Sequence, residues 1–123
     1  KAGNNVLPGL QETWDETFDQ DVLSSGVVNL VLFTATNCKP CESAREVVEE
    51  MQGRIKSESN YQIHSMDAVT NFVTTERFKV RSVPTLLLFN RAGIVVGEAI
   101  GARFPQDKML RMIRDAVAVT SAR

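Results

Sequence analysis

The sequence predicts an α/β fold in which a mixed central β-sheet is flanked by helices on both faces. Three patterns carry this prediction: a β-branched apolar run over 27–34, a long amphipathic helical pattern over 41–55, and two apolar strand patterns joined by a short turn at 90–93. A strand, a helix and a second strand in succession give a parallel pair, whereas a short turn joins antiparallel strands. Both kinds of pairing are therefore expected in one sheet.

Length and composition fit one ordinary globular domain. The chain has 123 residues, of which 43% are hydrophobic and 24% charged, which argues against disordered and low-complexity classes. Its 14 basic and 15 acidic residues leave a net charge of -1, so nucleic acid is not an expected partner. Apolar runs such as 27–33 are well short of the roughly 20 residues that cross a bilayer. We expect a flexible N-terminal segment at 1–12, a domain at 13–120 and a tail at 121–123.

The first half of the chain is expected to form a helix, a strand and a second helix. A capping-box spacing begins at Thr13, and apolar residues then recur at helical intervals, which predicts a helix over 14–23. The run 27–34 is typical of a central strand covered on both faces. Over 41–55 the apolar residues alternate steps of three and four, which predicts an amphipathic helix that begins at the cysteines.

The second half of the chain shows shorter patterns that have the periodicities of helices and strands. The connection at 90–93 is too short for a crossover, so the strands on either side of it should be antiparallel. The expected elements are a strand at 61–66, a short helix at 67–77, strands at 85–89 and 94–100, and a helix at 106–120.

The two cysteines, Cys38 and Cys41, carry the chemistry of this sequence. A thiol reacts as its thiolate, and a helix N-terminus stabilises that anion through unpaired backbone N–H groups. Pro40 suits the first helical turn, and Lys39 adds a nearby positive charge. The spacing lets Cys41 return within bonding reach of Cys38 and resolve a mixed disulfide there. Because Cys41 lies on the apolar stripe of the helix, we expect it to be the less exposed thiol.

A strand, a CxxC motif and a helix in this order resemble the thioredoxin family, and the resemblance runs from about Trp14 to Val119. It implies a thioredoxin fold in which the Val83–Pro84 bond is cis and faces the cysteines. The Val83 backbone would then pair with an extended substrate segment. The segments that carry the resemblance are 17–23, Leu32-Phe33, Cys38-Lys39-Pro40-Cys41, Met66-Asp67 and 81–89, with Gly93 and Gly101.

The sequence departs from the common pattern of that family around the cysteines. Members commonly have a Trp before the first cysteine, a buried Asp beneath the second, a Lys near that Asp, and Gly-Pro between the cysteines. This chain has Asn37, Leu32, Ile63 and Lys39-Pro40 at those places. Leu32 removes the obvious general base for the resolving thiol. It also removes a negative charge that would oppose thiolate formation, so we expect Cys38 to be more acidic than a free thiol.

The resemblance implies a thiol-disulfide oxidoreductase that exchanges disulfides with protein or peptide cysteines. Cys38 would attack and Cys41 would resolve, while Val83, Pro84, Lys39 and Pro40 would contact the substrate. The electrons reside in the sulfurs, so neither an organic cofactor nor a metal is expected, but an external reductase or thiol pool must restore the working state. We expect a monomer with no membrane span. A cytoplasmic location is favoured, with the bacterial periplasm as the alternative.

Other interpretations remain open at this stage. The protein could be a binding module of the same fold with incidental redox activity, or a periplasmic disulfide oxidase or isomerase. The cysteine pair could be a structural clip, or a dimer could share four thiolates in a zinc site. The remaining candidates have structural interpretations: His64 as a packed or solvated strand residue, the glutamates of 42–50 as an outward helix face, Trp14 and Phe18 as packed on the sheet, and Met66, Met109 and Met112 as core.

Overall fold

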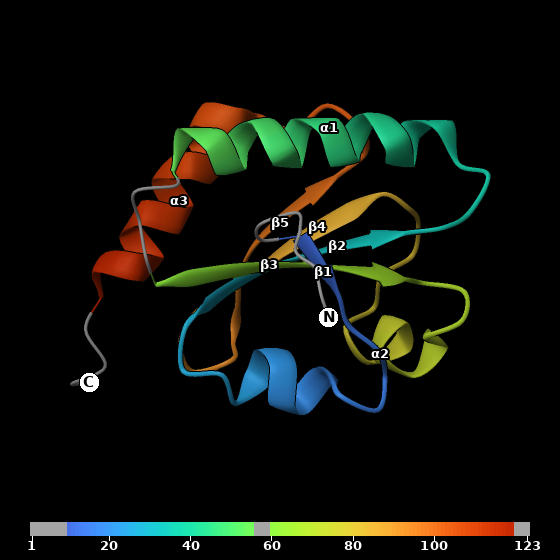
Figure 1. Cartoon of the computed structure of the whole chain (residues 1–123), viewed down its shortest axis with the longest axis horizontal. Helices are drawn as coiled ribbons and strands as arrows, with labels where there is room; N and C mark the ends of the chain where they lie inside the picture. Colours follow the sequence, from blue (N-terminus) through green and yellow to red (C-terminus); the bar gives the residue numbers. More distant parts are fainter. Residues whose placement is uncertain (1–9, 56–59, 120–123) are drawn as a thin grey trace.

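The computed structural model describes residues 10–55 and 60–119, which form a five-stranded mixed sheet with helices on both faces (Figure 1). The sheet has the order β1-β3-β2-β4-β5, in which β1 and β2 both run parallel to β3, while β4 is antiparallel to β2 and β5. The predicted mixed sheet and its central strand are thus confirmed. The strands are β1 (Leu10–Glu12), β2 (Val28–Thr34), β3 (Tyr61–Asp67), β4 (Thr85–Phe89) and β5 (Val95–Ile100).

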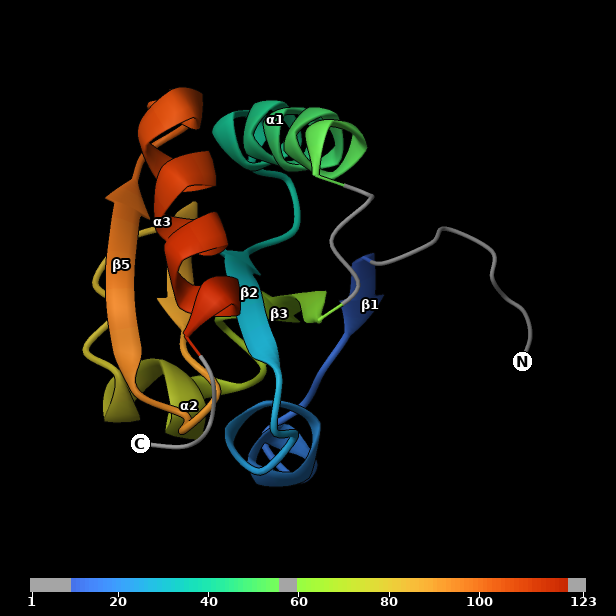
Figure 2. The same cartoon turned by 90° about the vertical axis from the view of Figure 1, so that its left-hand side faces the viewer.

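Two longer helices cover one face of the sheet, and two short helical segments cover the other (Figures 1 and 2). The first face carries α1 (Lys39–Arg54) and α3 (Gln106–Ala118). The second face carries α2 (Phe72–Arg77) and a π-helical turn at Asp19–Leu23. Figure 2 shows β1 and β5 at opposite edges of the sheet. Among the helices of the described residues, none is both long and apolar enough to cross a membrane.

The N-terminal part of the chain differs from its prediction. The helix expected over 14–23 is reduced to the π-helical turn Asp19–Leu23. In place of a capping box, the Thr13 hydroxyl donates a hydrogen bond of 2.8 Å to Asp21 Oδ2. Trp14 is 44% exposed, so its predicted packing on the sheet is wrong, whereas Phe18 is buried as expected.

Residues 10–12 lie in the segment expected to be flexible, but they form strand β1 at the sheet edge. Their pairing with β3 uses backbone hydrogen bonds, which leave little trace in side-chain periodicity. Residues 1–9 and the predicted tail at 121–123 lie outside the described residues.

The core consists of two apolar layers, one on each face of the sheet. Alternate side chains of β2 enter opposite layers: Leu30 and Leu32 pack beneath α1 and α3, whereas Val31 and Phe33 pack on the other side. This alternation explains why every residue of β2 is buried, as a strand covered on both faces must be. Each such large apolar side chain contributes about 1.5–3 kcal/mol when fully buried. The carboxyl end of β2 is therefore held in place by buried packing, and it positions the loop that follows it.

The remaining core predictions agree with the structure. Met66 and Met109 are buried, and Met112 packs against the layer beneath α3. In the opposite layer, three aromatic rings have centroids 5.2–5.7 Å apart in tilted and edge-to-face contacts, namely Phe18, Phe78 and Phe89.

Candidate active site

Cys38 and Cys41 form a disulfide at the start of α1, with their Cα atoms 5.2 Å apart. Cys38 is the N-cap residue and has an extended backbone conformation. The backbone N–H of Cys41 donates to both Cys38 Sγ and the Cys38 carbonyl, over 3.2 and 3.1 Å, and the N–H of Glu42 donates to the same carbonyl over 3.2 Å. The helix therefore begins at the cysteines, as the sequence predicts, and the N–H of Cys41 points at the Cys38 sulfur.

The two sulfur-bearing residues differ in exposure. Cys41 is only 3% exposed, because its place in α1 is on the buried stripe that continues through Ala44 and Val48. Cys38 is partly exposed, and Lys39 and Pro40 beside it are exposed. The predicted difference between the thiols is confirmed. Of the two cysteines, Cys38 is the more exposed.

The loop before the cysteines ends on a residue with unusual backbone geometry. Asn37 has a φ of 55°, in the left-handed region that asparagine tolerates better than most residues. Asn37 is also exposed. The position that commonly holds a large aromatic ring in this family thus supplies a tight turn into Cys38.

Val83 and Pro84 lie at the same end of the sheet as the cysteines. The pairing of Phe33 with Thr85 places the start of β4 beside the carboxyl end of β2, from which the loop leads to Cys38. The Val83–Pro84 peptide bond is cis. Pro84 is buried, and its carbonyl accepts a hydrogen bond of 2.9 Å from the Gly101 N–H, while Val83 is partly exposed.

The register of the sheet shows which residues of β3 adjoin Leu32. Ser65 pairs with Leu32, and Ile63 pairs with Leu30, the next residue of β2 on the same face. Leu32 and Ile63 both belong to the apolar layer beneath α1. The side chain of β3 directly beside Leu32 is therefore polar, namely the hydroxyl of Ser65.

A pocket of about 350 Å³ opens on this row, next to the disulfide. Its lining joins the ends of β1, β2 and β3 to the first turns of α1. Sequence reasoning missed most of these residues, because only the sheet order brings the three strand ends together. The residues that line the pocket are Glu12, Thr34, Ala35, Thr36, Asn37, Cys38, Cys41, Glu42, Arg45, Ser65 and Asp67.

His64 is separated from this pocket by the sheet. Side chains of β3 alternate, and His64 shares the face of Met66, opposite α1. Its Nε2 lies 3.1 Å from Asn29 Oδ1 and 3.3 Å from Gln62 Oε1. Burial lowers the pKa of His64 below its ordinary value, although the charge of Asp21 acts in the other direction. These contacts agree with its interpretation as a packed strand residue.

The fold and the cysteine site together define a class of protein. A mixed sheet carries a disulfide at the N-terminus of the helix after its central strand, with one cysteine buried and the other partly exposed. That arrangement belongs to proteins that exchange disulfides with partners through a local two-cysteine couple.

Comparisons with known proteins give the family. The thioredoxin family model matches residues 9–115. Thioredoxin from Staphylococcus saprophyticus is 35% identical over 80% of this chain and 89% of its own length, and thioredoxin from Mycobacterium bovis is 37% identical over 84% and 85%. A solved structure of a mutant thioredoxin from Halobacterium salinarum has a TM-score of 0.74 and 26% identity, covering 96% of this chain and 99% of that one.

The chain belongs to the thioredoxin family, and it is a thiol-disulfide oxidoreductase of protein disulfides. The predicted fold, family and activity are thus confirmed. The two alternatives, a binding module with incidental redox activity and a disulfide oxidase or isomerase, are not favoured by these relatives.

Proposed function

We propose that the reduced protein transfers two electrons to a protein disulfide, with Cys38 as the attacking thiol and Cys41 as the resolving thiol. The observation that carries this assignment is the difference in exposure, because only a reachable sulfur can attack a disulfide in another protein. The N–H of Cys41, which points at Cys38 Sγ, would stabilise the Cys38 thiolate. Because Cys41 is buried, its thiol would attack only the mixed disulfide that forms on the neighbouring Cys38.

The substrate would lie against the exposed rim of the disulfide. Lys39 and Pro40 would contact it on one side, and Val83 and Pro84 on the other, since both pairs lie at the same end of the sheet. A partly exposed Val83 leaves its backbone positioned to pair with an extended substrate segment, as a further short strand would. Such backbone pairing depends little on the substrate sequence.

A second partner must return the electrons. Oxidised protein holds the Cys38–Cys41 disulfide, and an external reductase or a thiol pool would cleave it. A bifunctional thioredoxin reductase/thioredoxin from Mycobacterium leprae is 35% identical over 86% of this chain and 22% of its own length, and its name supports a reductase of that kind as the donor. We propose that the protein works as a monomer, since the site is built from one chain.

Insulin reduction with dithiothreitol as electron donor tests this assignment. The wild type should accelerate the reduction, Cys38→Ser should abolish the acceleration, and Cys41→Ser should accumulate a mixed disulfide that mass spectrometry detects on Cys38. Equal rates with and without Cys38 would refute the assignment. A mixed disulfide that accumulates on Cys41 in the Cys38→Ser variant, with full activity, would reverse the two roles.

A further inference from the structure

We propose that Glu12, at the end of β1, accepts the proton that Cys41 releases when it resolves the mixed disulfide. The proposal rests on the proposed function, in which Cys41 is the resolving thiol. It gives the protein a proton acceptor on an edge strand in place of the carboxylate that is absent from the central strand at Leu32.

The need for an acceptor follows from the surroundings of Cys41. The residue is 3% exposed, and its helix stripe continues through Ala44 and Val48 into the apolar layer that also contains Leu32. Burial disfavours the thiolate, which is the form that attacks a disulfide. A carboxylate that receives the proton as the sulfur attacks removes part of this cost.

The sheet register places Glu12 in the row that passes beneath the start of α1. Glu12 of β1 pairs with Ser65 of β3, and Ser65 in turn pairs with Leu32 of β2. Leu10, the alternate residue on the same side of β1 as Glu12, packs against the apolar layer beneath α1. Glu12, Ser65 and Leu32 therefore share one face of the sheet and form one transverse row.

A continuous pocket connects that row to the buried sulfur. Glu12, Ser65 and Cys41 all line the pocket of about 350 Å³. A water molecule occupies about 30 Å³ of liquid volume, so the pocket has room for a chain of several waters. The hydroxyl of Ser65, which both donates and accepts hydrogen bonds, lies between Glu12 and Leu32 in the row and lines the pocket together with Cys41.

The other two carboxylates of the pocket are less suited to this role. Asp67 Oδ1 already accepts hydrogen bonds from the N–H groups of Val69 and Thr70, at 2.9 and 3.0 Å. Glu12 and Glu42 are both exposed, but Glu42 follows Cys41 directly, which turns it about 100° away around the helix. The Glu12 carboxylate accepts no hydrogen bond from any of the residues described at 10–55 and 60–119.

Arg45 completes the charge arrangement. It follows Cys41 by one helical turn, lines the same pocket and makes no ion pair with the described part of the chain. Its positive charge would favour the Cys41 thiolate during the transfer.

Cys41 gives its proton through Ser65 or pocket water to Glu12, and its sulfur attacks Cys38 Sγ. A bond forms between the two protein sulfurs while the bond from Cys38 to the substrate sulfur breaks, and its electron pair leaves with the substrate as a thiolate. The substrate is reduced, the protein is oxidised to the disulfide, and Glu12 returns its proton to solvent.

Stopped-flow reaction of the reduced protein with a symmetric nitrobenzoate disulfide separates the two steps. Attack by Cys38 releases one coloured thiolate, and resolution by Cys41 releases the second. In Glu12→Gln we expect the first phase to be unchanged and the second to slow about tenfold at neutral pH. The difference in second-phase rate between Glu12→Gln and the wild type should vanish at alkaline pH, where Cys41 ionises without a proton acceptor in the protein. Glu12→Asp should restore most of the rate, which a merely structural role of the side chain would not predict.

The controls keep the proposal apart from the function on which it rests. Ser65→Ala should slow the second phase without altering β1, whereas Glu46→Gln, on the exposed face of α1, should change neither phase. A second phase of wild-type rate and pH profile in Glu12→Gln, or a slowed one in Glu42→Gln instead, overturns the role of Glu12. A first phase that survives in Cys38→Ser overturns the proposed function.

Discussion

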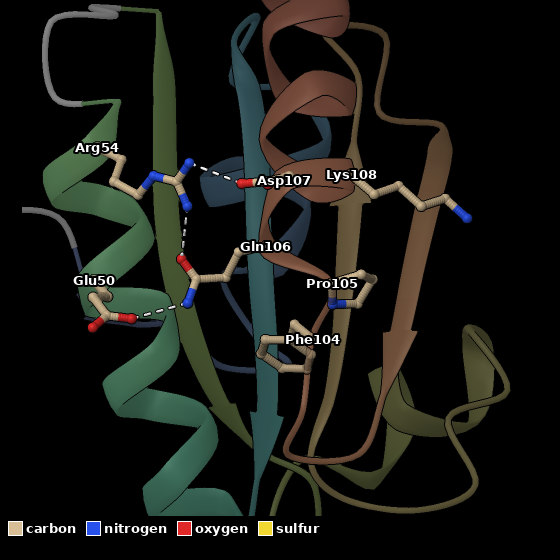
Figure 3. A pocket seen from close by; sticks show the side chains of 7 residues that line it. All are labelled: Glu50, Arg54, Phe104, Pro105, Gln106, Asp107 and Lys108. Atoms are coloured by element: carbon tan, nitrogen blue, oxygen red, sulfur yellow. Dashed lines mark hydrogen bonds and ion pairs between the residues drawn. The ribbon is translucent and has the colours of Figure 1, made fainter.

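The two ends of α1 both carry charged residues around a pocket, but they use them differently. At the C-terminal end, Figure 3 shows a continuous chain of hydrogen bonds: the amide of Gln106 donates to Glu50 over 2.9 Å, and Arg54 donates to Gln106 and Asp107 over 3.2 and 2.9 Å. At the N-terminal end, Arg45 and the carboxylates beside Cys41 make no ion pairs with the residues described.

The difference teaches which polar groups are available for chemistry. Paired groups at the far end hold α1 against the start of α3, and their charges are already compensated. Charged groups that form no ion pair can respond to a charge that appears on a buried sulfur beside them, since no oppositely charged side chain has to be displaced. The following predictions test this contrast.

Placing a carboxylate in the core should cause the largest loss of unfolding free energy among these variants. Leu32→Asp should lower the unfolding free energy by about 2–5 kcal/mol at pH 7, because a large buried apolar group is lost and a charge gains no partner. Urea denaturation measures this loss. It should shrink as the pH falls, since the protonated acid is cheaper to bury, whereas Leu32→Asn should show no such pH dependence.

The same variant sharpens the contrast between Leu32 and Glu12. With an acid beneath Cys41, the second stopped-flow phase should no longer respond to Glu12→Gln. A double variant that is as slow as Glu12→Gln alone would show that a carboxylate in the central strand cannot replace the one at the edge.

The buried His64 should make stability depend on pH. Because burial lowers its pKa, the unfolded chain binds the proton first, and the unfolding free energy should fall as the pH drops below about 6.5, by at most about 1.4 kcal/mol per pH unit. His64→Gln should flatten this region in urea denaturation series. An unchanged slope in His64→Gln would contradict the assignment of this pH dependence to His64.

Asp15 affects stability in a lower pH range. Burial opposes its charge, but hydrogen bonds from Thr74 and Val73 prevail and lower its pKa. Its contribution to the unfolding free energy is therefore lost only in stronger acid.

The start of α1 should make Cys38 more acidic than a free cysteine. Ultraviolet absorbance of the thiolate in Cys41→Ser, which isolates one thiol, should rise at a pH below the ordinary value of about 8.5. Lys39→Gln should shift the rise to slightly higher pH. A transition at or above the free-cysteine range would contradict the contribution of the helix N-terminus.

The smallest change in stability and kinetics is expected at the C-terminal end of α1. Arg54 and Asp107 are 49% and 76% exposed, so Arg54→Met should change the unfolding free energy by no more than about 1 kcal/mol and leave both stopped-flow phases unchanged. Arg45→Met is the matched variant at the near end, and it should slow the second phase. Equal kinetics in the two variants would remove the distinction between the two ends.

Local patterns in the sequence predicted most of the elements that build the site. The steps of three and four from Cys41 to Ile55 predicted α1 and its buried stripe, and the apolar run before the cysteines predicted β2. These predictions hold because side-chain burial in helices and strands follows the period of the backbone. The same stripe also predicted which of the two cysteines is buried.

Other features required the tertiary structure. Strand β1 is short and has one apolar residue, so its pairing with β3 left no periodic signal, and Trp14 proved to be exposed. The pairing of Ser65 with Leu32 depends on the register of β2 and β3, which no local pattern predicts.

The sequence by itself determined the fold class, the cysteine couple and the order of burial of its two sulfurs, since each depends on residues close together along the chain. Only the tertiary structure decided which polar groups surround Cys41. Neighbours across a sheet depend on strand order and register, and these bring Glu12 and Ser65 together from distant parts of the chain.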